Sequence, residues 1–196
     1  MFKRLFSIIG IIILALGILY ISLLSVAKGS RPSLAVAGKG SLTTIVATPT
    51  STAKVQYYLV YPGMLPDHPF YKLKMMRDKI WDFLTTNSLK KANLLLLFAD
   101  KRVGAGQVLI EGNKIPLGLS TLIKGEKYLE RAVEQTIIAK EKGGNISELA
   151  GRIRLAILKH QEILSGIREK LNDEGRTSID NVLKLLQTLK EQTQGL

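Results

Sequence analysis

The residues of this chain that could carry acid–base or metal chemistry are few and widely spaced. The chain has two histidines, His68 and His160, and no cysteine. His68, between Asp67 and Pro69, is typical of a turn, and His160 falls on the apolar face of a predicted helix, where a hydrogen-bonded core histidine is expected. Neither histidine follows a glutamate by three residues, as in the Glu-x-x-His motif of di-iron bundles. We therefore predict no catalytic, cofactor-binding or metal site.

Three glutamates share one face of a predicted helix at spacings of four, namely Glu126, Glu130 and Glu134. Such a row is compatible with an acid cluster. However, Lys127 and Arg131 alternate with the glutamates at ion-pair spacing, so we expect a solvated, ion-paired face. With no catalytic constellation elsewhere, the chain is not expected to be an enzyme.

A second group of charged residues lies on the first two predicted helices of the domain. We expect these side chains to form a structural network that pins the two helices together. The alternative is a contact with a ligand or partner, formed where a proline-rich segment meets the helices. The group consists of Arg77, Asp78, Asp100, Lys101 and Arg102.

Residues 57–71 contain three prolines and four tyrosines. Each proline fixes its own φ angle and biases the preceding residue towards extended geometry. We therefore expect a stiff, ordered crossing whose aromatic side chains lie across the helices.

Apolar residues recur at helical spacing through most of residues 55–196, which predicts an all-α domain with a bundle of about five helices. A tandem helical repeat is the less favoured alternative. The predicted helices run from near Phe70 to Phe83 or Leu84, from a cap at Asn87 or Ser88 to Gly112, from Pro116 to Gly143, from a capping box at Asn145 and Glu148 to Gly175, and from Thr177 or Ser178 onwards.

The spacing also predicts which side chains face the core. The fourth helix has the most regular apolar face, and Gly104 and Gly106 are poor helix formers inside the second. The side chains expected to point inwards are Leu73, Met76, Ile80, Trp81 and Phe83 in the first helix, Ile146, Leu149, Ile153, Ile157, His160, Leu164, Ile167 and Leu171 along the fourth, and Ile179, Val182, Leu183, Leu186 and Leu189 in the last.

Residues 5–27 form an uncharged apolar run that is long enough to cross a bilayer as a helix. We expect residues 1–28 to be a membrane anchor. Lys3 and Arg4 favour an N-terminus inside the cell and a domain outside the cytoplasm, although cations also follow the run. The alternative is a signal peptide whose cleavage secretes the domain, because residues 25–27 and 35–37 both resemble cleavage sites.

Residues 29–54 are rich in Gly, Ser, Thr, Ala and Pro and are expected to form a flexible linker to the helical domain, residues 55–196. The formal charge of the chain is +12, and all acidic residues follow residue 54. This excess favours anionic partners, such as lipid headgroups or an acidic envelope polymer, without choosing among them. The absence of cysteine excludes disulfides and thiolate metal sites.

One stretch of sequence resembles an uncharacterised bacterial family of helical, extracytoplasmic domains. The resemblance implies an architecture and a location but no reaction, and it is strongest between Tyr61 and Arg102 and fades after Leu129. It rests on Tyr61, Pro62, Gly63, Leu65, Pro66, Asp67, His68, Pro69, Tyr71, Leu73 and Lys74, then Arg77 and Asp78, Lys90 to Ala92, and Phe98 to Arg102.

These observations predict a single-pass, membrane-anchored helical module at the cell envelope that acts by binding or scaffolding. Residues 5–27 would contact the bilayer, and the partner would be an anionic envelope polymer or another protein. One alternative is a sensor domain that works through another membrane protein. A second is a cytoplasmic, membrane-tethered module that contacts nucleic acid; it requires the opposite topology and is less favoured. The residues expected to bind the partner, or to form the structural network, are Tyr61, Pro62, Pro66, Asp67, His68, Tyr71, Arg77, Asp78, Asp100, Lys101 and Arg102.

Overall fold

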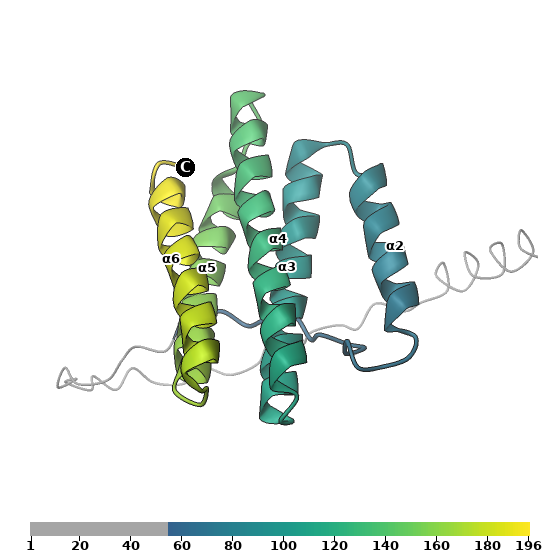
Figure 1. The fold of residues 1–196 in the computed structure, drawn as a ribbon. Coiled ribbons are helices and arrows are strands. Elements are labelled where there is room, and N and C mark those ends of the chain that lie inside the picture. Colours follow the sequence, from purple (N-terminus) through teal and green to yellow (C-terminus); the bar gives the residue numbers. More distant parts are fainter. Residues whose placement is uncertain (1–54) are drawn as a thin grey trace, which may run out of the picture. The chain divides into compact units, whose positions relative to one another are not determined.

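The computed structural model describes residues 55–196, which contain five helices and no strand (Figure 1). The predicted all-α class and helix number are confirmed for this part of the chain. The predicted membrane anchor and linker, residues 1–54, lie outside the described residues. None of the described helices is both long and apolar enough to cross a bilayer. The helices are α2 (Tyr71–Leu84), α3 (Ser88–Glu111), α4 (Ile115–Glu141), α5 (Ser147–Arg168) and α6 (Asp173–Gln194).

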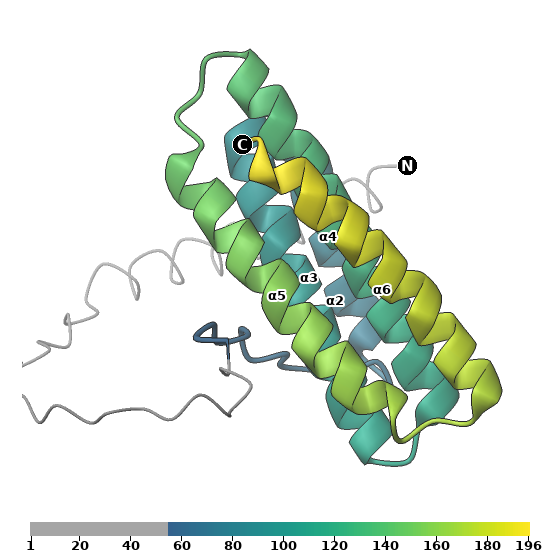
Figure 2. The same ribbon diagram turned by 90° about the vertical axis from the view of Figure 1, so that its left-hand side faces the viewer.

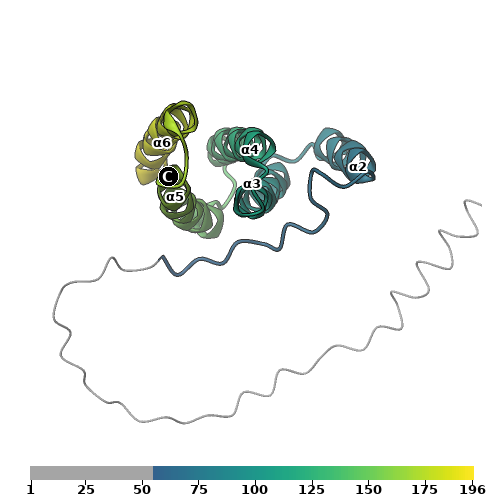
Figure 3. The ribbon, with the colours of Figure 1, turned by 60° about the horizontal axis from the view of Figure 1, so that its bottom comes forward.

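Successive helices run antiparallel, as short connections require. Viewed along the helix axes, α3 and α4 occupy the centre, α5 and α6 lie on one side and α2 lies on the other (Figure 3). Figure 2 shows α5 and α6 as a long hairpin beside the central pair. The core is therefore formed by α3 to α6, with α2 attached at its edge.

Most helix ends follow the predicted signals. The Asn87 side chain accepts a hydrogen bond from the backbone N–H of Lys90 at the start of α3, and α4 begins at Ile115 with Pro116 in its first turn. Gly143, at φ +77°, follows the end of α4 in a conformation that favours glycine.

Two predicted boundaries were wrong. Asn145 accepts a hydrogen bond from Ser147, two residues on, and α5 has no side-chain cap, so the capping box with Glu148 does not form. The last helix begins at Asp173, where Asn172 caps Gly175, whereas Gly175 was expected to end the preceding helix. An asparagine cap at the N-terminus outweighs the low helix propensity of one glycine in the first turn.

The predicted apolar face of α5 is confirmed, because all eight side chains expected to point inwards are buried. On α6, Ile179, Val182, Leu186 and Leu189 are buried as predicted, and Leu183 is partly buried. The apolar residues of both predicted faces belong to one hydrophobic core with the inner faces of α3 and α4, except Ile146, which joins a small separate cluster with Ala139 and Ala150.

The predicted inner face of α2 was wrong. Leu73, Met76, Ile80, Trp81 and Phe83 are all exposed, by 50% to 83% of their surface. The only buried residue of α2 is Asp78. The helical period of the apolar residues was correct, but the periodicity does not tell whether an apolar face meets the core or points away from it.

Glycines allow α3 and α4 to approach closely. A Cβ atom on Gly106 would lie 2.5 Å from Cγ of Leu122 and 3.0 Å from the carbonyl oxygen of Gly118. A Cβ atom on Gly118 would likewise lie 2.5 Å from Cγ1 of Ile110 and 3.0 Å from the carbonyl oxygen of Gly106. The glycine that costs helix propensity in α3 is thus required by the packing of α4 against it. Gly104 lies under the ring of Pro62, whose Cδ would be 3.7 Å from a Cβ at this position, an ordinary contact distance.

Residues 55–70, here called the strap, precede α2 without regular secondary structure. The predicted crossing is confirmed for Tyr57 and Leu59, which pack against the core, and for Pro62, which lies over Gly104. It is wrong for Tyr58 and Tyr61, which are 88% and 81% exposed.

Four polar side chains join the strap to three helices inside the core, and we call them the polar core cluster: Tyr57, Asp100, Glu126 and His160. Nδ1 of His160 lies 3.1 Å from Oε2 of Glu126, and Nε2 lies 3.2 Å from Oδ1 of Asp100. The Tyr57 hydroxyl donates to Oδ2 of Asp100 at 2.7 Å. His160 and Glu126 are fully buried, and Asp100 is 2% exposed. A doubly protonated imidazolium supplies the two N–H donors that two ionised carboxylates accept.

Electrostatics favours the charged form of His160. Burial by itself lowers its pKa, but the charge of Glu126 and the hydrogen bonds that His160 donates to both carboxylates raise the pKa to about 9. Burial, followed by the charge of Asp100, raises the pKa of Tyr57, so its hydroxyl remains a donor.

The cluster also corrects a sequence prediction. Glu126 was expected on a solvated face with Glu130 and Glu134, yet it is completely buried against His160. Burial of this carboxylate is tolerated because a cationic partner on α5 compensates its charge. His160 itself is a hydrogen-bonded core histidine, as predicted.

We expect Gly106→Ala to lower the free energy of unfolding by about 1–3 kcal/mol, because the added methyl group overlaps buried Leu122. Gly166→Ala is the matched control, since a Cβ there meets open space and should stabilise α5 by about 0.5–1 kcal/mol. Urea denaturation of both variants measures the difference. Equal effects of the two substitutions would contradict the close approach of α3 and α4.

The polar core cluster predicts a pH-dependent stability. The pKa of His160 is raised from 6.5 to about 9 in the folded state, so its stabilisation is fully present below about pH 6.5 and is lost as pH rises through about 9. Urea denaturation between pH 6 and 10 should show this loss in the native chain and in His68→Gln. His160→Gln should lack it; an unchanged pH profile in that variant would rule out His160 as the source.

Candidate functional site

Arg102 is a cation buried where α2, α3 and α4 meet. It is 7% exposed, and its guanidinium donates to the Tyr71 hydroxyl at 3.4 Å, the Met75 sulfur at 3.0 Å and the Tyr128 hydroxyl at 3.5 Å. The guanidinium also lies over the Tyr128 ring, 4.6 Å from its centroid. Gly125 of α4 allows this approach, because a Cβ there would lie 3.1 Å from Cβ of Arg102.

All of these contacts are with neutral groups. Among the described residues, Arg102 forms no ion pair. The nearby buried carboxylate of Asp78 is instead bound by Arg77, which donates to it at 2.7 and 3.1 Å. A buried cation without an anionic partner is costly, so the site is electrostatically suited to receive an anion.

Arg102 lines a groove between α2 and α4, here called the cationic groove. It has a volume of about 710 Å³ and continues into a smaller hollow of about 210 Å³ that shares Met75, Arg102 and Lys124. Neither is lined by an acidic residue. The groove is lined by Pro66, His68, Pro69, Tyr71, Lys72, Met75, Lys79, Arg102, Leu117, Ser120, Thr121 and Lys124, and the hollow adds Lys127, Tyr128 and Arg131.

Exposed lysines surround the buried arginine. Lys72 and Lys79 come from α2, and Lys124 and Lys127 come from α4. In the part of the chain that the structure describes, none of these four lysines is in an ion pair. Arg131 differs, since it binds Asp82 at 2.8 Å. The groove therefore holds a local excess of positive charge.

Tyr71 adds a neutral donor to the groove. Burial raises the pKa of this phenol, although the neighbouring charge of Arg102 opposes the change. The Tyr71 hydroxyl therefore stays protonated at neutral pH and, while accepting from Arg102, can donate its own proton to a ligand. Arginine, lysine and hydroxyl donors together suit the oxygen atoms of phosphate or carboxylate groups.

The structure brings together four residues predicted for the site, because Pro66, His68, Tyr71 and Arg102 all line the groove. It does not bring in Asp67, which pairs with Lys114, or Tyr61, which is largely exposed. Pro62 lies over α3, as described above.

The single charged network predicted between the first two helices was wrong. Arg77 and Asp78 pair with each other within α2, and Asp100 belongs to the polar core cluster. Lys101 lines a small hollow beside Asp78 and Arg102. Residues two apart on a helix point in nearly opposite directions, so Asp100 faces α5 while Arg102 faces α2 and α4.

The four lysines of the groove were not predicted from the sequence. Their spacing contained a signal, because Lys72 and Lys79 are seven residues apart and Lys124 and Lys127 are three apart, which places each pair on one helix face. That the two faces line the same groove depends on where the fold places α2 and α4, which the spacing does not show.

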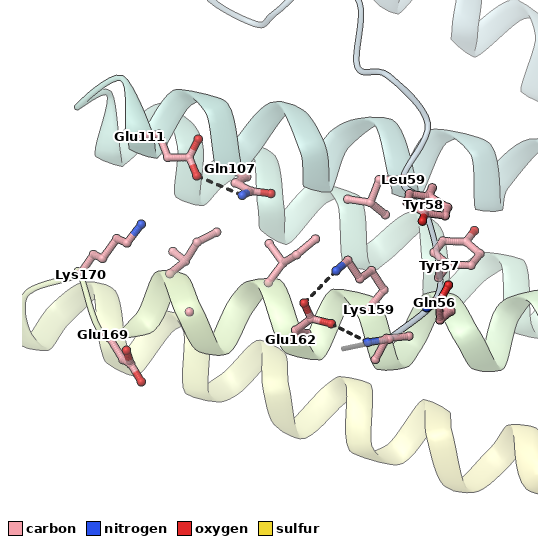
Figure 4. Close-up of a pocket in the computed structure, with 14 residues that line it drawn as sticks. Gln56, Tyr57, Tyr58, Leu59, Gln107, Glu111, Lys159, Glu162, Glu169 and Lys170 are labelled. Atoms are coloured by element: carbon pink, nitrogen blue, oxygen red, sulfur yellow. Dashed lines mark hydrogen bonds and ion pairs between the residues drawn. The ribbon is translucent and has the colours of Figure 1, made fainter. Parts of the chain in front are cut away.

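A second pocket, of about 740 Å³, lies between the strap and helices α3 and α5 (Figure 4). Several of its polar groups bind one another: Lys159 pairs with Glu162 at 2.8 Å, Val55 N–H donates to Glu162 and Gln107 donates to Glu111. Because its charges are of both signs and largely paired, it offers less to a ligand than the cationic groove. Within residues 55–196, no group of three or more His, Asp or Glu side chains is arranged to hold a metal ion.

Comparisons with known proteins identify a family but no activity. No curated protein and no solved structure matches the chain. A family model described as a domain of unknown function, DUF5667, matches residues 63–174. The match extends from the end of the strap through α5, well beyond Leu129, where the resemblance was expected to fade. The chain therefore belongs to the DUF5667 family, domains of unknown function.

Proposed function

We propose that this chain is a membrane-anchored, non-enzymatic helical module that binds an anionic ligand in the cationic groove. The observation that carries the proposal is Arg102, a buried guanidinium whose contacts are all neutral. Phosphate or carboxylate oxygens would supply the missing negative charge.

The surroundings of Arg102 support binding rather than chemistry. The groove supplies lysine ammonium groups and the Tyr71 hydroxyl, no carboxylate lines it, and Nδ1 of His68 already accepts a hydrogen bond from the backbone N–H of Phe70 at 3.2 Å. Its volume of about 710 Å³ accommodates several phosphate groups or a lipid headgroup.

The location of the module is part of the proposal. Residues 1–28 would anchor the chain, residues 29–54 would act as a linker, and the helical domain would lie outside the cytoplasm. A sensor that reports through another membrane protein would use the same groove. The nucleic-acid alternative also suits a cationic groove but requires the domain to face the cytoplasm.

Loss of the buried cation should weaken anion binding without weakening the fold. The test is a titration of the full chain, in nonionic detergent, with tripolyphosphate. We expect Arg102→Met to reduce the affinity for tripolyphosphate by about tenfold or more, which is the effect of losing one charge-assisted hydrogen bond. The melting temperature without ligand should stay the same or rise, because the substitution removes an uncompensated buried charge.

Arg176→Met is the matched control, since it makes the same charge change on α6, where Arg176 only pairs with Asp173. If both variants lost affinity equally, the loss would be due to the change in net charge, and specific binding in the cationic groove would be contradicted. A marked fall in melting temperature for Arg102→Met would assign Arg102 a structural role; Lys124→Gln, at an exposed position, then tests the groove independently.

The proposed topology predicts that alkaline phosphatase fused to the C-terminus is active in cells, because this enzyme folds only outside the cytoplasm. A fusion that retains only Met1 to Arg4 before the domain should be inactive. An expressed but inactive full-length fusion would overturn the extracytoplasmic location and favour the cytoplasmic alternative.

A further inference from the structure

The face of α2 that points away from the bundle carries an unusual amount of apolar surface. Leu73, Met76, Ile80 and Leu84 follow one another at spacings of three and four, so they lie on one side of the helix, with Trp81 and Phe83 at its borders. These six side chains are 50% to 83% exposed, and we call them the outward face of α2. A contiguous patch of this kind marks a contact surface.

The charges of α2 are segregated around this face. Both acidic residues are directed to the bundle: Asp78 is buried and pairs with Arg77, and Asp82 pairs with Lys91 and Arg131. The helix also contributes Lys72 and Lys79 to the cationic groove, so these cations flank the outward face on that side.

Arg77, four residues after Leu73 and four before Trp81, lies on the same side of the helix as the outward face. The Arg77 side chain is 56% exposed and lies over the Trp81 ring, 5.7 Å from its centroid. Apolar residues bordered by lysine, arginine and tryptophan are the composition of helices that lie in the interface of an anionic bilayer.

We infer that α2 lies on the surface of a bilayer that contains anionic lipids, with its outward face at the boundary between headgroups and acyl chains. The cationic groove then receives lipid phosphates, so the inference rests on the proposed function and names the source of its anion. As a helix of 14 residues, α2 is about 21 Å long, sufficient for an interfacial contact without spanning.

A second copy of the chain suits this face less well. Pairing two α2 helices through their apolar stripes would bring Arg77 of both copies into the contact and Lys72 and Lys79 to its edge. Paired helices are normally stabilised there by opposite charges, but Asp78 and Asp82 are turned towards the bundle and already paired. Anionic headgroups supply the opposite charge instead.

The chain also supplies a reason for the domain to meet a membrane. If residues 5–27 anchor it, the 27 residues from 28 to 54 extend at most about 95 Å, which keeps α2 within reach of the same bilayer. The anchor would then hold α2 at a high effective concentration of lipid, so that even a weak contact of α2 with the bilayer is populated.

Trp81 is the only tryptophan of the chain and lies on the outward face, so its fluorescence reports on α2 alone. We would reconstitute the full chain in vesicles of phosphatidylcholine with or without phosphatidylglycerol. With the anionic lipid, the emission should shift to shorter wavelength and be quenched by lipids brominated on their acyl chains. In neutral vesicles both effects should be clearly smaller.

Variants separate this inference from the proposed anion site. The double variant Leu73→Gln, Ile80→Gln should lose most of the lipid quenching while binding tripolyphosphate normally in detergent, and Leu155→Gln, at another exposed apolar position on α5, should behave as the native chain. If the native chain failed to bind tripolyphosphate but was still quenched by brominated lipid, only the proposed anion site in the cationic groove would be overturned.

Two results would overturn the bilayer contact. One is water-exposed, unquenched Trp81 in anionic vesicles. The other is a blue shift that grows with protein density, without quenching by brominated lipid, which would assign the outward face to a second copy.

Discussion

The buried interaction of His160 with Asp100 and Glu126 is the constraint that the rest of the domain depends on. It links α3, α4 and α5 at one depth in the core, and Tyr57 extends it to the strap. Two carboxylates and one imidazolium exclude a slipped helix register, because any slip would leave a buried charge without its partner. Asp100 thereby also fixes the direction of Arg102, two residues further along α3.

The sequence predicted the parts of the fold that depend on local pattern. The regular apolar face of α5, the Asn87 cap and the glycines after α4 were correct, since spacing and backbone conformation determine them. Gly106 was recognised as anomalous, but its reason, the approach of Leu122 and Gly118, depends on a helix elsewhere in the chain. Glu126 was misplaced for the same reason: its partner His160 is 34 residues away.

The site was less predictable than the fold. The strap motif and Arg102 were singled out by residue type, and four of those residues do meet in the groove. The lysines that give the groove its charge come from α2 and α4, and sequence spacing alone cannot show which helix faces converge. The apolar period of α2 was also ambiguous, because the same pattern suits a core face or a contact surface.

Because α2 is weakly attached, its outward residues and the core residues can be substituted almost independently. Since α2 buries only Asp78, replacing its outward side chains removes almost no contact from the core formed by α3 to α6. Substitutions on that face that keep the helix should thus leave the core intact. The outward positions of α2 can therefore be substituted at little cost to the bundle, whereas the glycines and buried charges of the centre admit little variation.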